Sequence, residues 1–295
     1  LSGEVYWERR NVARGCEITG DGRTVFLQPP DSDQVIALRA ADGADVGIHT
    51  LPDAESRLMT TGGTIVAWTQ TGDGRMLRGI DARTADVRWQ HAFSDDAQAD
   101  VVEAEEIAVL EPQGRLVIVS AGDGKPRFEQ RLEPADGLQG LTVLRARERY
   151  VVLTRVPHRQ PNLVNQASFG VESRLVNGPA YALDRETGEI LWSTRVENQG
   201  IDLNQPPNLP VLIFTIRHYP QFPAGRVAQQ YSLLVLDART GREIHDENST
   251  QSMQNFDVLT DRGGESIQLD FYSFSVRLTT TDDPLPEPAS LKSEP

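Results

Sequence analysis

The sequence predicts an all-β protein, specifically a β-propeller built from four-stranded antiparallel blades. One hairpin motif occurs six times, and 40, 42, 39, 64 and 53 residues separate the successive copies. Short apolar runs, bounded by turns rich in glycine and proline, fill the intervals. About 40 residues is the length of one propeller blade. A chain of 295 residues with 38% hydrophobic side chains is long enough to form one large domain of this kind.

The most complete copy of the motif spans residues 180–196. An apolar strand leads into a turn that begins at Asp184 and ends at Gly188, and the following strand carries Trp192. Aspartate favours such a turn because its carboxylate accepts bonds from nearby backbone, and glycine favours it because it adopts positive φ. The flanking Tyr, Leu, Ile, Trp and Val residues suit a half-buried strand. This segment is therefore predicted to be a β-hairpin.

The other copies share parts of this pattern. The aspartate four residues before the turn position recurs as Asp81, Asp184 and Asp237, and the aromatic residue four residues after it recurs as Trp7, Trp89, Phe128 and Trp192. In the last copy His245 stands at the aromatic position. We expect these residues to stabilise turns and to pack blades together. The residues assigned to the structural repeat are Trp7, Asp81, Trp89, Phe128, Asp184, Gly188, Trp192, Asp237 and Gly241.

The ends of the repeat predict how the ring closes. Three strand candidates between residues 256 and 279 lack a closing hairpin, and residues 4–10 form a strand candidate with nothing before it. Together they make one blade, so at least six blades are predicted, with the ring closed by strands from both termini. The chain opens at Leu1, which suggests a processed product or a piece of a longer protein, and upstream blades would make the ring seven or eight. Residues 1–279 are predicted to form the propeller domain, and residues 280–295, rich in proline, a disordered tail.

The two long intervals contain insertions at residues 157–177 and 218–230. Both come just before the strand that leads to the turn, so they are expected on the same face of neighbouring blades. Long loops on a rigid scaffold commonly carry function. They are the predicted binding surface, of a protein or a small polar ligand. The candidate binding residues are His158, Arg159, Asn165, Phe169, Arg174, His218, Tyr219, Phe222 and Arg226.

Composition argues against several classes of protein. The 43 acidic and 29 basic residues give a net charge of −14, which repels phosphate backbones and disfavours nucleic-acid binding. No run reaches the roughly 18 apolar residues of a membrane span, so direct membrane insertion is not expected. Cys16 is the single cysteine, which excludes an internal disulfide and a cysteine-based zinc cluster.

Motifs for catalysis are missing from the sequence. It contains neither the Gly-x-Ser-x-Gly elbow of a serine nucleophile nor a phosphate-binding glycine loop. No two of its five histidines have metal-ligand spacing; the insertions could bring His158 and His218 together, but exposed loop histidines are the favoured interpretation. The acidic cluster at residues 103–106 is interpreted as a solvated edge or turn. No catalytic, cofactor-binding or metal-binding residue is therefore predicted.

The hairpin consensus, Ala-Leu-Asp-x-x-Thr-Gly-x-x-x-Trp, resembles the repeat of the PQQ-like (quinoprotein-like, BamB-type) β-propeller superfamily. Residues 181–192 and 235–241 match it most closely. The resemblance implies that the tryptophan packs between blades and that the Asp and Thr brace the turn. One branch of the superfamily contains dehydrogenases that hold PQQ and calcium beside an adjacent cysteine pair, which this sequence lacks. The other, BamB-type branch is non-enzymatic.

We therefore expect a non-enzymatic scaffold, or a protein- or ligand-binding domain, within a larger bacterial multidomain protein. The resemblance implies an extracytoplasmic location in the periplasm or cell envelope. No cofactor is expected. The alternative is a PQQ- and calcium-dependent quinoprotein dehydrogenase, degenerate or genuine. A third hypothesis is a hydrolase or lyase that uses carboxylates at the mouth of the channel.

Overall fold

A computed structural model gives the structure of the chain. It describes residues 5–279 except 21, 31, 33, 51–53, 73, 104, 147, 158–172, 204, 207–208, 219–229, 250–256, 261–265 and 272–273.

Every regular element among the described residues is a β-strand, which confirms the predicted all-β class. The strands are β1 (Glu17–Gly20), β2 (Thr24–Gln28), β3 (Gln34–Arg39), β4 (Asp45–Thr50), β5 (Ala54–Thr61), β6 (Thr64–Thr71), β7 (Gly74–Asp81), β8 (Val87–Phe93), β9 (Gln98–Glu103), β10 (Glu106–Leu110), β11 (Arg115–Ser120), β12 (Pro126–Arg131), β13 (Gly140–Ala146), β14 (Arg149–Arg155), β15 (Ser173–Asp184), β16 (Ile190–Asp202), β17 (Val211–His218), β18 (Gln230–Asp237), β19 (Glu243–Ser249), β20 (Asp257–Thr260), β21 (Ser266–Asp270) and β22 (Ser275–Thr279).

These strands form six successive antiparallel units, which we call blades 1 to 6. Blades 1, 2 and 3 are the four-stranded sheets β1–β4, β5–β8 and β9–β12. Blade 4 (β13–β16) and blade 5 (β17–β19) belong to one seven-stranded sheet, because β16 continues beyond blade 4 until Ile201 pairs with Phe214 of β17. Blade 6 is the three-stranded sheet β20–β22. The predicted four-stranded antiparallel architecture is thus confirmed.

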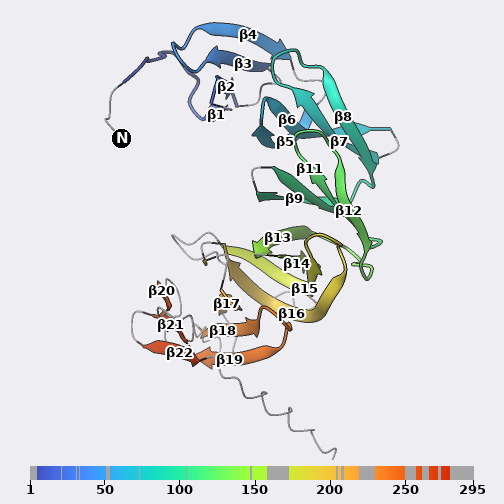
Figure 1. Cartoon of the computed structure of the whole chain (residues 1–295), viewed down its shortest axis with the longest axis vertical. Helices are drawn as coiled ribbons and strands as arrows, with labels where there is room; N and C mark the ends of the chain where they lie inside the picture. The colour runs from blue at the N-terminus through green and yellow to red at the C-terminus, as the bar shows by residue number, and fades with distance from the viewer. Residues whose placement is uncertain are drawn as a thin grey trace, which may run out of the picture.

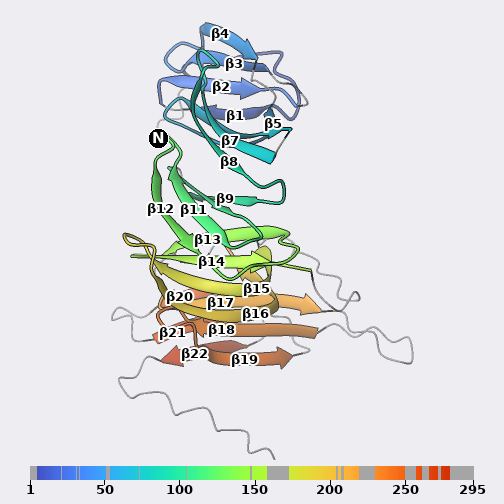
Figure 2. The same ribbon diagram turned by 90° about the vertical axis from the view of Figure 1, so that its right-hand side faces the viewer.

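The blades follow one another along an open arc, with blade 1 and blade 6 at opposite ends in both views (Figures 1 and 2). The predicted closure of the ring by terminal strands is not seen. The described N-terminal residues 5–10 form no strand, and blade 6 has three strands rather than four. The first strands of blades 1 to 4 approach one another along the inside of the arc, whereas the fourth strands β4, β8 and β12 lie at its rim and are largely exposed (Figure 1).

Each junction between successive blades buries its own apolar cluster. Between blades 3 and 4, for example, Ile118 and Leu116 pack with Tyr150 and Leu183, all of which are fully buried. The clusters arise because each central strand alternates its side chains between two faces, and both faces meet a neighbouring blade. The core is therefore a series of sheet-on-sheet layers rather than one central mass.

Aromatic residues lie over the turn glycines of the next blade. A Cβ added to Gly241 would lie 2.5 Å from the ring of Trp192, and one added to Gly188 would lie 2.6 Å from the ring of Phe128. Both glycines have positive φ, at 70° and 75°. The Trp192 Nε1–H also donates to the Ala238 carbonyl at 3.1 Å. The same aromatic-on-glycine contact joins Trp7 to Gly43 and Trp89 to Gly124.

The junction between blades 1 and 2 lacks the aromatic-on-glycine contact, and both of its residues differ from those of the other junctions. Gly47 stands where the aromatic residue would be, and Ala85 stands at the turn position, with φ +62°. Because residue 47 is a glycine, it places no ring over residue 85, where an alanine is found. The two exceptions therefore explain each other, and glycine is required at this turn mainly where an aromatic ring covers it.

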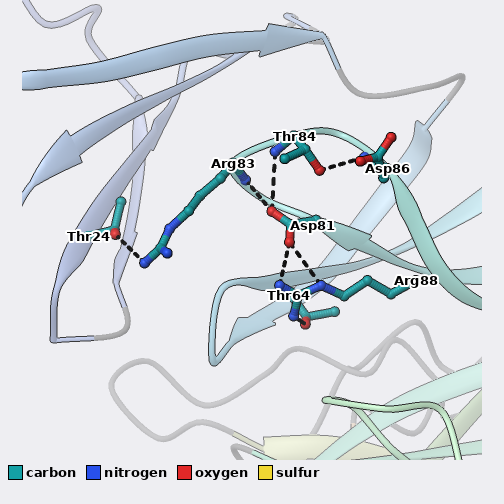
Figure 3. Close-up of polar contacts among 7 residues, drawn as sticks. All are labelled: Thr24, Thr64, Asp81, Arg83, Thr84, Asp86 and Arg88. Atoms are coloured by element: carbon teal, nitrogen blue, oxygen red, sulfur yellow. Dashed lines mark hydrogen bonds and ion pairs between the residues drawn. The ribbon is translucent and has the colours of Figure 1, made fainter.

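The aspartate of each complete turn accepts bonds from the backbone ahead of it. In blade 2, Asp81 Oδ1 accepts from the N–H groups of Arg83 at 2.7 Å and Thr84 at 3.2 Å (Figure 3). Asp81 also forms an ion pair with Arg88, whose guanidinium donates to Thr64 Oγ1 at 2.7 Å. Asp184 accepts in the same way from the N–H groups of Glu186 and Thr187, at 2.9 and 2.8 Å.

These bonds predict a pH dependence of stability. Burial raises the pKa of Asp81, but the bonds from Arg83, Arg88 and Thr84 outweigh it, so the pKa lies below its usual value. The unfolded state then binds more protons at acidic pH, and the stabilisation is full above about pH 4 and is lost as the pH falls through the folded-state pKa. Asp81→Asn should lower stability at pH 7 by at most about 1 kcal/mol, since the pair is partly exposed. Urea unfolding over a pH series would test this: the difference between variant and wild type should shrink at acidic pH, and a constant difference would contradict it.

Candidate functional site

The predicted loop surface lies mostly outside the described residues. His218 is the last residue of β17, where its backbone pairs with Gln230. Arg174, in β15, is the one candidate whose side chain is described. The remaining candidates lie outside the described residues, namely His158, Arg159, Asn165, Phe169, Tyr219, Phe222 and Arg226.

Arg174 forms an ion pair with Asp100, which comes from β9 in blade 3. The Asp100 side chain is only 6% exposed, whereas that of Arg174 is 44% exposed. The second carboxylate oxygen of Asp100 accepts from the backbone N–H of Val143 in β13, at 2.7 Å. Asp100 therefore joins the first strands of blades 3 and 4 to the start of β15, which lies within the 157–177 insertion.

A pocket of about 250 Å³ opens beside this ion pair. Its walls come from blades 3, 4 and 5: β9, β13 and Arg174 of β15, together with Leu203, Gln205, Pro206, Leu209 and the start of β17. Most of the lining side chains are aliphatic, while Thr142, Arg145 and Gln205 add polar groups. The principal aliphatic members are Val101, Val102, Leu144, Leu203, Leu209 and Leu212.

Gln205 holds the wall opposite β13 in place. Its Nε2–H donates to the Asp202 carbonyl at 2.8 Å, and its Oε1 accepts from the Ile213 N–H at 3.0 Å. These two bonds link the end of β16 to β17 across the described part of the connection. The pocket therefore has braced walls on both sides: Asp100 ties β9 to β13, and Gln205 ties β16 to β17.

The sequence did not indicate this pocket. Asp100 follows an Ala and precedes two Val residues, and no nearby pattern distinguishes it from a surface aspartate. Its partner Arg174 lies 74 residues away. The sequence offered one indication that Arg174 is functional: it lies in an insertion that the repeat does not require. The blade contacts bring it to the first strands, where sequence analysis placed no functional residue.

The acidic cluster at residues 103–106 was interpreted incorrectly at its last member. Glu106 is 7% exposed, not solvated. It accepts a hydrogen bond of 2.7 Å from the Tyr150 hydroxyl and pairs with Arg127 at 3.0 Å. Burial, together with the Glu106 carboxylate, raises the pKa of Tyr150 to about 12. The buried Glu106 carboxylate thus has a hydrogen-bond donor from blade 4 and a cation from blade 3, the partners that a buried charge requires.

No group of three or more His, Cys, Asp or Glu residues in the described part of the chain is arranged to hold a metal ion. Among the same residues, no helix has the length and apolar character needed to cross a bilayer.

Comparison with known structures gives distant similarities. One is BamB from Moraxella catarrhalis, at 15% identity and a TM-score of 0.34, with 86% of this chain and 81% of that chain covered. Another is a quinohemoprotein alcohol dehydrogenase from Pseudomonas putida, at 12% identity and a TM-score of 0.42. There the match covers 86% of this chain but 56% of the enzyme, so the chain spans little more than half of the enzyme's length. No curated protein matches the sequence.

The family comparison also covers most of the chain. The profile of the family described as outer membrane protein assembly factor BamB matches residues 1–152 and 171–265. The matched ranges contain all six copies of the hairpin motif and leave out most of the 157–177 insertion. This agrees with the PQQ-like repeat found in the sequence. The chain therefore belongs to the family described as outer membrane protein assembly factor BamB.

Proposed function

We propose that this protein is a non-catalytic binding platform and that the pocket between blades 3, 4 and 5 binds a segment of a partner protein. The observation that carries the proposal is the composition of the pocket: aliphatic walls beside one charged pair. Binding pockets generally combine apolar walls with a few placed polar groups. An aliphatic side chain would bury its surface in the pocket, and an acidic neighbour would meet the exposed part of Arg174.

The size of the pocket favours a side chain over a cofactor. Its 250 Å³ lies below the range of about 300–1,000 Å³ that is usual for small-molecule sites. One or two aliphatic side chains of a peptide fit such a volume. A bound segment would gain most of its affinity from those few buried groups, as protein interfaces commonly do.

The lining residues do not fit a calcium–quinone centre. Calcium takes six to eight oxygen ligands, several of them carboxylates. Among the described residues that line the pocket, Asp100 is the one carboxylate, and its two oxygens already accept from Val143 and Arg174. This supports the proposal that the pocket binds its partner without PQQ or calcium.

Family membership supports the wider setting of the proposal. The matched family is described as an assembly factor for outer membrane proteins. We propose the same setting for this chain: an extracytoplasmic scaffold, within a larger bacterial multidomain protein, that presents its pocket to a partner. The insertions at residues 157–177 and 218–230 would extend the contact surface, because Arg174 of the first insertion already lines the pocket.

A pair of matched substitutions tests the proposal. Val101 lines the pocket and is 37% exposed, and Val87, in the outer strand β8, is 43% exposed. The probe is an immobilised library of short unstructured peptides. We expect the wild-type protein to select peptides in which an aliphatic residue lies beside an acidic one. Val101→Arg should weaken their binding by about tenfold or more, the loss of about 1.4 kcal/mol expected for a central contact.

Val87→Arg should leave peptide binding unchanged, which controls for added charge and for surface mutation in general. If Val101→Arg binds the peptides as tightly as the wild type does, the pocket is not the binding site. Dye-linked alcohol oxidation by the wild-type protein after addition of PQQ and Ca²⁺ would instead favour the dehydrogenase alternative.

A further inference from the structure

The pocket between blades 3, 4 and 5 is locally basic in a strongly acidic chain. Its described lining residues include two cations, Arg145 and Arg174, and one anion, Asp100, which leaves a local net charge of +1. The chain as a whole has a net charge of −14. Nearby charges outweigh distant ones, because salt and water screen the distant ones. The pocket therefore favours an anionic group over a cationic one.

Thr142 gives the pocket a buried hydroxyl. It lines the pocket and is only 5% exposed. Along β13 it alternates with Leu141 and Val143, which pack against blade 3, so its side chain lies on the opposite face, as that of Leu144 does. Among the described residues, the structure gives this hydroxyl no hydrogen-bond partner. A hydroxyl buried to this degree requires a partner, which water or a bound group in the pocket would supply.

Arg174 is a second donor, and Asp100 positions it. The guanidinium carries five N–H donors, and its Nη1 pairs with one oxygen of Asp100. The other oxygen of Asp100 accepts from the backbone N–H of Val143, the residue next to Thr142. Arg174 and the backbone beside Thr142 thus bind opposite oxygens of the same carboxylate. Since the Arg174 side chain remains 44% exposed, it can also bind an anion in the pocket.

The aliphatic walls and the two donors belong to a single pocket of about 250 Å³. In an extended peptide, successive side chains point to opposite sides, and those that share a side are roughly 7 Å apart. An acidic residue next to an aliphatic one would therefore direct its carboxylate away from the pocket. The last residue of a chain differs, because its side chain and its α-carboxylate are attached to the same Cα. One such residue supplies both the apolar group and the anion.

We infer that the pocket binds the C-terminal residue of its partner, an inference that rests on the proposed function. This residue is aliphatic, and its α-carboxylate accepts from the Arg174 guanidinium and the Thr142 hydroxyl. Its side chain lies against the Val and Leu walls. The acidic group that meets Arg174 is then the α-carboxylate itself and not a neighbouring side chain. Capture of a C-terminal carboxylate is a recurring mode of peptide recognition.

Three peptides labelled with fluorescein at the N-terminus test the inference. The first is Gly-Ser-Gly-Ser-Leu with a free carboxylate, and the second is the same peptide as a C-terminal carboxamide. The third, Gly-Ser-Leu-Asp-Gly carboxamide, carries an aliphatic and an acidic side chain but no free α-carboxylate. Fluorescence anisotropy gives the affinity of each for the whole chain. We expect the free acid to bind about tenfold or more tightly than either carboxamide, as the loss of hydrogen bonds to a charged group implies.

Thr142→Val connects this preference to the pocket. Valine keeps the shape of the side chain but removes the hydroxyl. The preference for free acid over carboxamide should fall by about threefold or more, because one hydrogen bond to the carboxylate is lost. The urea midpoint should not fall, since no described residue loses a hydrogen bond to this hydroxyl. Thr69→Val is the matched control: Thr69 is fully buried in β6 of blade 2, outside the pocket, and its substitution should leave the preference unchanged.

Equal affinity for the free acid and its carboxamide would overturn the inference. The internal Leu-Asp peptide binding as tightly as the free acid would do the same, as would a preference that Thr142→Val leaves unchanged. In each case the proposed function would stand, because the pocket would still bind a peptide. Absence of binding by all three peptides, together with no selection from the peptide library, would instead contradict the proposed function itself.

Discussion

Trp192→Ala is expected to lower the free energy of unfolding by about 3–5 kcal/mol, the usual cost of truncating a buried aromatic side chain. Trp192 is 8% exposed and packs in the apolar cluster between blades 4 and 5. The substitution would leave a cavity there and would also remove the bond to the Ala238 carbonyl. Urea unfolding followed by circular dichroism measures the effect directly.

Trp192→Phe separates the contribution of the buried ring from that of the hydrogen bond to the Ala238 carbonyl. Phenylalanine keeps an aromatic ring over Gly241 but cannot donate a hydrogen bond. Phe128 is the natural example, since its ring lies over Gly188 without such a bond. The free energy of unfolding should fall by only about 1–2 kcal/mol, the sum of one hydrogen bond and a modest loss of volume. If Trp192→Ala unfolds at the same urea concentration as the wild type, Trp192 does not hold the two blades together. Peptide binding at the pocket should persist under conditions in which Trp192→Ala remains folded.

Gly241→Ala is expected to lower the free energy of unfolding by about 2–5 kcal/mol. A left-handed conformation costs a non-glycine residue about 1–2 kcal/mol, and overpacking costs a further 1–3 kcal/mol. Both apply, since Gly241 has φ +70° and the added methyl group would lie 2.5 Å from the Trp192 ring. In a Trp192→Ala background the ring is gone, and the same substitution should cost only the conformational part, about 1–2 kcal/mol.

Ala85→Gly is the control at the equivalent turn. Ala85 already adopts φ +62°, and the residue of blade 1 at the aromatic position is Gly47. Glycine would relieve the left-handed strain but would add freedom to the unfolded chain, so stability should change by no more than about 1 kcal/mol. A large loss with Ala85→Gly, or additive effects of the Gly241 and Trp192 substitutions, would contradict the aromatic-on-glycine explanation.

The candidate site was much less predictable than the fold. Sequence analysis chose loops that interrupt the repeat, and of these residues the structure describes the side chain of Arg174. That residue does reach a pocket, but its partner Asp100 and the aliphatic walls come from inner strands of other blades. A pocket between blades depends on contacts between segments far apart in the chain, and no local pattern encodes them. Glu106 shows the same difficulty, because only its contact with Tyr150 across a blade junction makes it a buried residue.

The sequence by itself determined the repeating unit. An aspartate that binds the backbone ahead of it, a turn residue with positive φ and apolar strands on either side are local features, and their spacing gave the blades and the family. Tertiary structure alone decided which faces are buried. The same alternation of side chains produces two covered faces in a central strand such as β14 and a largely exposed strand at the rim, such as β12. The physical reason is that burial depends on what packs against a strand, and a strand's own residues specify only which side chains share a face.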